Sequence, residues 1–170
     1  MICEFWYHMF SLTLATQIDI AHLRDLSVNA FAEDRTHRPQ SINGGDPPGI
    51  ETIEKHEEWL YSKTYLKCTM NGNIVGSCIL QIEGEKGLLF GLHVNKQHMN
   101  KGIGSWIISE MQQMFPQVST WSLETPDYAS RNHYFYQKNG FKLTQITPKD
   151  ASLGFGFHQY TKIKMPNKSL

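Results

Sequence analysis

The chain has 170 residues, 40% of them hydrophobic and 12% aromatic, which suits one globular domain with its own core and excludes a disordered chain. Sixteen Lys and Arg residues balance sixteen Asp and Glu residues, so the chain lacks the basic excess of nucleic-acid-binding proteins. No apolar run approaches the roughly 20 residues of a membrane span, and the apolar N-terminus has neither the basic region nor the cleavage site of a signal peptide. We therefore expect no nucleic-acid partner and no membrane partner.

The cysteine and histidine residues give no sign of disulfide or metal chemistry. The chain has three cysteines and eight histidines. An odd number of cysteines without motif spacing favours reduced thiols and a cytoplasmic location. The histidines show neither HExxH spacing nor pairing with cysteines, so the sequence predicts no metal site.

The chain begins with a segment of unclear role, followed by a strand and a helix. Residues 1–10 are apolar and aromatic and are treated as an uncertain extension, either an extra edge strand or an upstream start. Residues 11–15 alternate as in a short strand. Thr16 and Asp19 have the spacing of a capping box, which predicts a helix ending near Glu33.

A loop and a second helix come next. The loop, residues 34–49, contains proline and glycine and is long for a connection between packed elements, which is typical of functional or mobile loops. The second helix is predicted over residues 50–62. Its apolar stripe is weak, and its several glutamates indicate a solvated face.

The middle of the chain predicts three antiparallel strands in series. Asn71-Gly72 is the strongest short hairpin signal and joins strands over residues 65–70 and 73–82. With a two-residue turn, Cys68 would face Val75, so it has no thiol opposite it. The third strand covers residues 88–94, where Gly91 indicates a bulge or a close backbone approach.

The last part of the chain alternates between helices and strands. A helix over residues 103–114 has apolar residues at 3.6-residue spacing, and a strand follows over residues 120–126. The next helix covers residues 128–139, with Gly140 as its C-terminal cap. Two further strands close the chain, and this order predicts a single mixed α/β domain over residues 1–170.

The segment Gly102-Ile103-Gly104 stands where a strand and loop meet a helix. The first turn of a helix has backbone N–H groups without partners and partial positive charge, and glycine has no Cβ to keep a phosphate away. This predicts a pyrophosphate cradle. A Rossmann site is a weaker interpretation, because Ile107 replaces the third glycine and residues 95–101 separate the strand from the first. A helix cap without a ligand is the third alternative.

Two segments together resemble a known family. VNKQHMNKGIGSWI and NHYFYQKNGF, with a strand between them, resemble the GNAT superfamily of acyl-CoA N-acyltransferases. The order of elements resembles that fold over residues 12–165. The resemblance implies a mixed, mostly antiparallel sheet of about six to seven strands flanked by about four helices.

The resemblance implies a site for acetyl-CoA as co-substrate. The family's loop Gln/Arg-x-x-Gly-x-Gly/Ala corresponds to residues 99–104, where Met99 departs from the pattern and Lys101 is a substitute source of positive charge. The strand edge at residues 92–94 would pair with the pantetheine arm as an added strand. The cofactor-binding residues implied are Leu92, His93, Val94, Met99, Asn100, Lys101, Gly102, Ile103, Gly104, Ser105 and Asn132.

The resemblance also assigns catalytic roles. The helix ending Phe135-Tyr136-Gln137-Lys138-Asn139-Gly140-Phe141 implies that Tyr136 protonates the departing CoA thiolate, although a core tyrosine with a satisfied hydroxyl is the alternative. The acceptor amine must lose a proton before it attacks. Glu124, at the end of its strand, is the first candidate base, and His93 and Asp127 are weaker ones.

The sequence therefore predicts transfer of an acetyl group from acetyl-CoA to a primary amine, by direct attack in a ternary complex. The acceptor, expected to be a small molecule, would meet the loop at residues 34–49 and the second helix, whose acidic residues include Asp34, Asp46 and Glu54. The alternatives are a non-catalytic acyl-CoA-binding module and, less favoured, a nicotinamide-binding protein. A homodimer is a family-level expectation, with the N-terminal decapeptide as its candidate interface.

Overall fold

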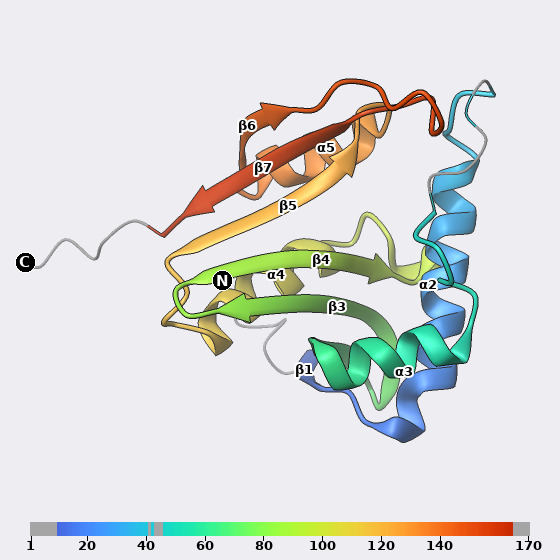
Figure 1. Ribbon diagram of the computed structural model, residues 1–170. Helices are drawn as coiled ribbons and strands as arrows, with labels where there is room; N and C mark the ends of the chain where they lie inside the picture. Colours follow the sequence, from blue (N-terminus) through green and yellow to red (C-terminus); the bar gives the residue numbers. More distant parts are fainter. Residues whose placement is uncertain (1–9, 41, 43–45, 165–170) are drawn as a thin grey trace, which may run out of the picture.

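The structure is a computed structural model that describes residues 10–40, 42 and 46–164 (Figure 1). Its elements, in chain order, are β1 (Phe10–Leu14), the 3-10 helix η1 (Gln17–Asp19), α2 (Ile20–Arg35), α3 (Ile53–Ser62), β2 (Thr64–Met70), β3 (Asn73–Glu83), β4 (Lys86–Val94), the 3-10 helix η2 (Lys96–His98), α4 (Ile103–Met114), β5 (Thr120–Pro126), α5 (Ser130–Lys138), β6 (Lys142–Ile146) and β7 (Phe157–Ile163).

One seven-stranded sheet organises the described residues. The strand order is β1-β2-β3-β4-β5-β7-β6, and every neighbouring pair is antiparallel except β4 and β5, which are parallel. This confirms the predicted mixed, mostly antiparallel sheet. The single domain was predicted over residues 1–170, and of these, residues 1–9 and 165–170 lie outside the described part of the chain.

Helices cover both faces of the sheet. Alternate residues of β2 show the division, since Tyr65 packs in the cluster formed with α2 and α3, while Leu66 packs in the cluster formed with α4. Ile107 and Met111 of α4 are fully buried in that second cluster. In Figure 1, α4 and α5 lie behind the sheet and α3 lies in front of it.

The predicted helices form with small shifts at their ends. Thr16 and Asp19 make the expected capping box, which opens η1 before α2 begins. The second helix begins at Ile53, later than predicted, because the Thr52 side chain accepts the Lys55 N–H and so sets the N-terminus. No helix among the described residues is long and apolar enough to cross a membrane.

The β2–β3 hairpin contains a bulge that the sequence did not predict. Met70 pairs with Asn73 across the Asn71-Gly72 turn, but the register shifts between Cys68 and Thr69. Cys68 therefore lies opposite Gly76, one residue from the expected position. No thiol stands opposite Cys68, as predicted.

Strands β4 and β5 diverge. Their pairing covers only Lys86 to Leu88 against Thr120 to Ser122, although β4 continues to Val94 and β5 to Pro126. The register of β4 also shifts near Gly91, where Leu89 and Gly91 are opposite consecutive residues of β3 and Phe90 is the extra residue. The predicted bulge is thus present, and a wedge opens between β4 and β5 (Figure 1).

Candidate functional site

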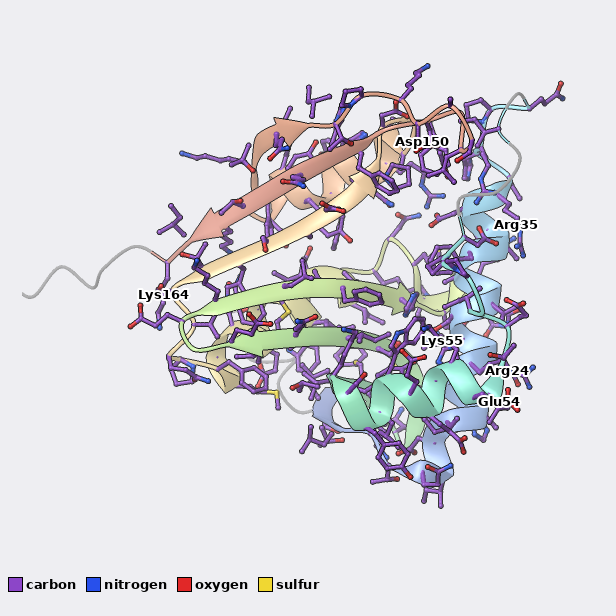
Figure 2. All side chains as sticks on the ribbon, viewed as in Figure 1. Arg24, Arg35, Glu54, Lys55, Asp150 and Lys164 are labelled. Carbon is purple, nitrogen blue, oxygen red and sulfur yellow. The ribbon has the colours of Figure 1, made fainter. Side chains whose placement is uncertain are left out.

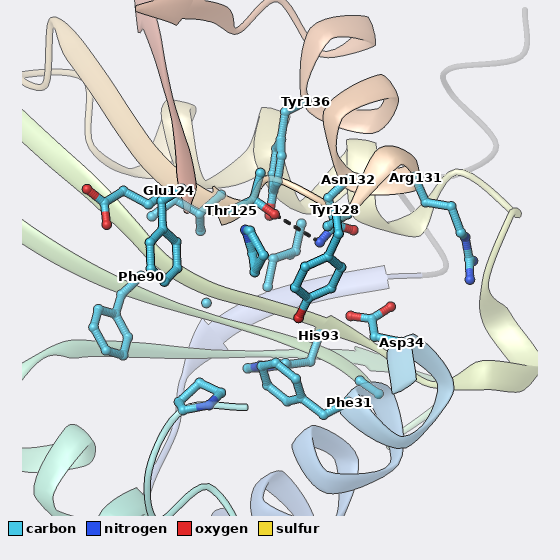
Figure 3. Close-up of a pocket in the computed structure, with 18 of the residues that line it drawn as sticks. Phe31, Asp34, Phe90, His93, Glu124, Thr125, Tyr128, Arg131, Asn132 and Tyr136 are labelled. Atoms are coloured by element: carbon cyan, nitrogen blue, oxygen red, sulfur yellow. Dashed lines mark hydrogen bonds between the residues drawn. The ribbon is translucent and has the colours of Figure 1, made fainter. Parts of the chain in front are cut away.

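A cavity of about 480 Å³ lies in the wedge between β4 and β5 (Figure 3). Four parts of the chain line it: the C-terminal end of α2 with the loop that follows, the strand β4, the segment from β5 into α5, and Phe157 at the start of β7. Beyond Leu88, the side of β4 that faces the wedge has no strand partner on β5. Its backbone polar groups are therefore available to an extended ligand.

The predicted cradle lies past the end of β4, at the N-terminus of α4. Gly102 is the N-cap of α4 and has a φ of 84°, a conformation that glycine adopts without strain. The first helical hydrogen bond runs from Trp106 N–H to Gly102 O, so the preceding N–H groups of Ile103, Gly104 and Ser105 have no carbonyl partner within the helix. This is the arrangement that binds anions at helix N-termini.

The two glycines of the cradle have different roles. A Cβ on Gly102 would meet nothing within 4 Å, so that position is open to a ligand. A Cβ on Gly104 would lie 2.9 Å from Cζ of Phe135, so Gly104 lets α5 approach α4 closely. The Ile103 side chain is buried in the core, and only its backbone can face a ligand.

The rest of the predicted loop precedes α4. Met99 is half-buried, and its N–H donates to Lys96 O at 3.3 Å. Asn100 has a positive φ of 59°, which helps to turn the chain towards Gly102. Lys101 is exposed, as a lysine that meets a phosphate from solvent would be. None of residues 99–105 lines the cavity, so the predicted cradle lies outside it.

Tyr136, the predicted acid, lines the cavity from α5. Its ring lies 5.2 Å from the ring of Phe135 and 5.9 Å from that of Phe141. Burial, together with the negative charge of Asp34, raises the pKa of Tyr136, so the hydroxyl keeps its proton. No hydrogen bond engages that hydroxyl within the described residues, which leaves it free to donate into the cavity.

Asn132 lies one turn before Tyr136 and also lines the cavity. Its Nδ2 donates to Thr125 Oγ1 at 3.2 Å, the bond drawn in Figure 3, which links α5 to β5. Its amide oxygen is left to accept from a ligand.

Strand β4 brings Leu92 and His93 to the cavity, whereas Val94 packs against the core beside Gly104. His93 is 5% exposed, and its Nδ1 lies 3.3 Å from Ser27 Oγ and 3.2 Å from Ser77 Oγ. Burial lowers the pKa of His93 to about 4, so the imidazole is neutral at neutral pH. These contacts describe a core histidine with one edge at the cavity.

The two carboxylates predicted as bases lie in different places. Glu124 lines the cavity but is exposed, and its Oε1 accepts from Gln159 Nε2 on β7. Asp127 does not line the cavity, because its Oδ2 accepts the Gly156 N–H at 3.1 Å and closes the turn before β7. The structure thus brings Glu124 and Tyr136 to one cavity and leaves Asp127 outside it.

Several cavity residues were not predicted as site residues. Phe90 and Tyr128 form part of the wall, and only the bulge signal at Gly91 pointed towards Phe90. The loop after α2 contributes Arg38 and Pro47, as expected for the acceptor side. The second helix contributes no lining residue, and Figure 2 shows Glu54 of α3 on the outer surface. Among the described residues, no three His, Cys, Asp or Glu side chains gather as a metal site would require.

Sequence comparison places the central part of the chain in a known family. Residues 61–143 match the acetyltransferase (GNAT) domain. None of the curated protein sequences matches the chain.

Solved structures share the whole fold at low sequence identity. The ribosomal-protein-S18-alanine N-acetyltransferase from Escherichia coli is 15% identical, covers 95% of this chain and 99% of its own, and gives a TM-score of 0.73. The PaiA N-acetyltransferase from Thermoplasma acidophilum, in complex with coenzyme A, is 16% identical over 91% of this chain and 98% of its own, with a TM-score of 0.73. A GNAT acetyltransferase from Elizabethkingia anophelis with acetyl-CoA bound is 16% identical over 91% and 97%, with a TM-score of 0.65.

Proposed function

The chain belongs to the GNAT acetyltransferase family, and we propose that it transfers an acetyl group from acetyl-CoA to the primary amine of a small-molecule acceptor. Two of the solved structures that share its fold hold coenzyme A or acetyl-CoA, which supports this choice of co-substrate. A cytoplasmic location and a homodimer stay predictions. Residues 1–9, which carry most of the candidate dimer interface, lie outside the described residues.

The observation that carries the proposal is the presence of three features in succession: the cradle, the unpaired edge of β4, and the Tyr136 hydroxyl at the cavity. The free N–H groups of residues 103–105 suit the pyrophosphate, and the unpaired edge of β4 suits the amides of the pantetheine arm. From Val94 back to Leu88 the strand spans roughly 20 Å, at about 3.3 Å per residue. An extended arm bound along it would bring its thioester to the cavity that Tyr136 lines.

The reaction proposed is direct attack. The neutral amine nitrogen forms a bond to the thioester carbon, and the carbon–sulfur bond then breaks. A base takes the proton that the ammonium loses before the attack. The departing thiolate takes the Tyr136 proton, and the second proton of the nitrogen returns to Tyr136 through solvent. Cys68 and Cys78 are not used, because burial raises the pKa of both thiols, to about 12 for Cys68, and an acyl-enzyme would need a thiolate.

The proposed reaction needs a base that takes a proton from the acceptor amine. Glu124 keeps its place as a candidate because it borders the cavity, although its carboxylate is exposed and bonded to Gln159. Glu124→Gln removes the proton acceptor while it preserves the shape of the side chain. A loss of about 100-fold or more in kcat with a primary amine would support the role of Glu124 as the base.

Tyr136→Phe tests the acid. The substitution removes only the hydroxyl, so we expect acetyl-CoA to bind normally by isothermal titration while turnover, followed as thiol release, falls by about 100-fold. Tyr134→Phe is the matched control, because Tyr134 lies on the same helix, is 70% exposed and does not line the cavity. Turnover close to that of the unchanged protein would remove Tyr136 from the mechanism.

The alternative is an acyl-CoA-binding module without catalysis. Titration with acetyl-CoA and with NAD separates the three interpretations of the glycine turn. Acetyl-CoA binding without thiol release across a panel of amines would favour the module. NAD binding without acetyl-CoA binding would overturn the proposal altogether.

A further inference from the structure

Asp34 is the acidic side chain at the end of the cavity opposite Glu124 (Figure 3). It stands in the last turn of α2, and Phe31, one turn earlier on the same face, also lines the cavity. The residue keeps an exposed surface, but the protein around its carboxylate withdraws that group from bulk water and raises its pKa. Asp34 acts electrostatically on both Tyr136 and Tyr128, so its charge is felt inside the cavity.

The carboxylate of Asp34 has no partner within the described residues. The neighbouring cations are engaged elsewhere or stand apart from it. Arg35 and Arg38 both pair with Asp46, and the Arg38 Nη2 lies 2.5 Å from Asp46 Oδ1. Arg131, His37 and Arg38 oppose the rise in the pKa of Asp34 by favouring its charged form, but Asp34 makes no ion pair with any of them.

The walls next to Asp34 are aromatic. The ring of Phe31 lies 5.6 Å from the neutral ring of His93, and Tyr128 borders the same end of the cavity. Phe90 and Phe157 continue the apolar wall along the cavity. An ammonium group is stabilised by a carboxylate and by aromatic faces together, and a flat apolar body buries its area against such rings. Besides the residues already named, the charged or titratable side chains that line the cavity are Glu124 at the opposite end and His37, Arg38 and Arg131, which act electrostatically on Asp34.

From this arrangement we infer that Asp34 binds the ammonium group of the acceptor, and that the acceptor is an arylalkylamine, with one primary amine on an aromatic body. The inference rests on the proposed acetyl transfer. In that reaction Asp34 replaces Glu124 as the base. The bound R–NH3+ gives one proton to Asp34, the nitrogen attacks the thioester carbon, and the thiolate leaves with the Tyr136 proton. The second proton of the nitrogen returns through solvent to the Tyr136 phenolate, and Asp34 releases the first proton to solvent. Both side chains are thereby restored, and the products are R–NH–acetyl, CoA–SH and one released proton.

The test compares several acceptors on the unchanged 170-residue chain, and then compares variants with that chain. We expect 2-phenylethylamine to give a higher kcat/KM than spermidine, phenylalanine or a tripeptide with a free N-terminus. Asp34→Asn should lower kcat/KM for 2-phenylethylamine by about 100-fold or more, with the dissociation constant of acetyl-CoA unchanged. The loss should exceed that of Glu124→Gln. Asp25→Asn is the matched control, because Asp25 lies on the same helix, 62% exposed and paired with Arg24 outside the cavity.

The possible results separate failure of this inference from failure of the proposed function. If the unchanged protein binds acetyl-CoA but acetylates no amine, both the function and this inference fall. If it acetylates spermidine, phenylalanine or the peptide best, only the acceptor class is overturned. If Asp34→Asn keeps kcat/KM near that of the unchanged protein, the assignment of Asp34 is overturned. Asp34→Glu, which keeps the charge, should recover part of the activity lost in Asp34→Asn, and equal losses in both variants would indicate a merely structural role.

Discussion

His93 shows how a single buried residue ties the site to the stability of the fold. Its Nδ1 contacts two buried serines from different elements, Ser27 of α2 and Ser77 of β3. The same ring forms part of the cavity wall. Protonation of His93 would therefore place an uncompensated charge between α2 and the sheet, which explains the direction in which its pKa moves.

The stability of the protein should fall as the pH falls from about 6.5 to about 4. The folded pKa of His93 is lowered to about 4 from 6.5, so in that window the unfolded chain binds a proton that the folded chain does not. The contribution is fully present above pH 6.5 and declines by up to about 1.4 kcal/mol per pH unit below it. Burial lowers the pKa of His56 in the same direction.

Urea unfolding at several pH values measures this slope. His93→Gln should flatten it, and His22→Gln, at an exposed position of α2, should leave it unchanged. An equal slope in the protein and in His93→Gln would mean that other groups set the acid sensitivity.

At the scale of elements, the closeness of α4 and α5 depends on Gly104. Gly104→Ala would place a Cβ 2.9 Å from Phe135 Cζ, so the Phe135 ring must move, and Tyr136 follows it in the chain. We expect a loss of about 1–3 kcal/mol of stability from overpacking and weaker acetyl-CoA binding. Gly102→Ala is a comparison with no clash, in which only the positive φ of 84° is strained, at a cost of about 1–2 kcal/mol.

A double-mutant cycle separates the two causes. Phe135→Leu replaces the ring that meets Gly104 with a shorter side chain. It should therefore recover part of the stability lost in Gly104→Ala and none of that lost in Gly102→Ala. Additive losses for Gly104→Ala and Phe135→Leu would show that the two residues do not determine the approach of α4 to α5.

Local patterns predicted the elements well, and the cavity less well, for a physical reason. The Asn71-Gly72 turn, the Thr16–Asp19 capping box and the glycine turn before α4 are all set by neighbours a few residues apart. The cavity instead joins the end of α2, the middle of β4 and the start of α5. Hydrophobic periodicity and motif spacing do not show which of these distant segments come together, so Tyr128 was not predicted as a site residue.

The same limit applies to register and to chemistry. The bulge near Cys68 depends on how β1, β3 and the core pack against β2, and no residue of β2 alone predicts it. Glu124 was predicted from its place near a strand end, and it lines the cavity. Its bond to Gln159 arises from the β5–β7 pairing and could not be read from either segment alone.

At the scale of the whole molecule, the sheet consists of two parts joined by a short parallel contact. β1 to β4 form one antiparallel part and β5, β7 and β6 the other, and the strand pairing between the two parts covers residues 86–88 and 120–122. The wedge that holds the cavity starts where this contact ends. The angle between the two parts therefore sets the width of the site. Of the paired residues that control this angle, only Leu88 lines the cavity.

Gly87→Ala tests this control. Gly87 pairs with Trp121, and a Cβ at Gly87 would lie 2.5 Å from ring carbons of that buried indole. Because the indole is packed in the core and has no free space to enter, the two parts of the sheet must separate, and we expect a loss of about 1–3 kcal/mol in urea unfolding. Acetyl-CoA binding should weaken as well, since the wedge changes shape.

Gly84→Ala is the control in the neighbouring turn, where a Cβ meets nothing within 4 Å and only the φ of 59° is strained, at a cost of about 1 kcal/mol. If Gly87→Ala lost no more stability than Gly84→Ala and bound acetyl-CoA as tightly as the unchanged protein, the contact between Gly87 and Trp121 would not set the geometry of the wedge.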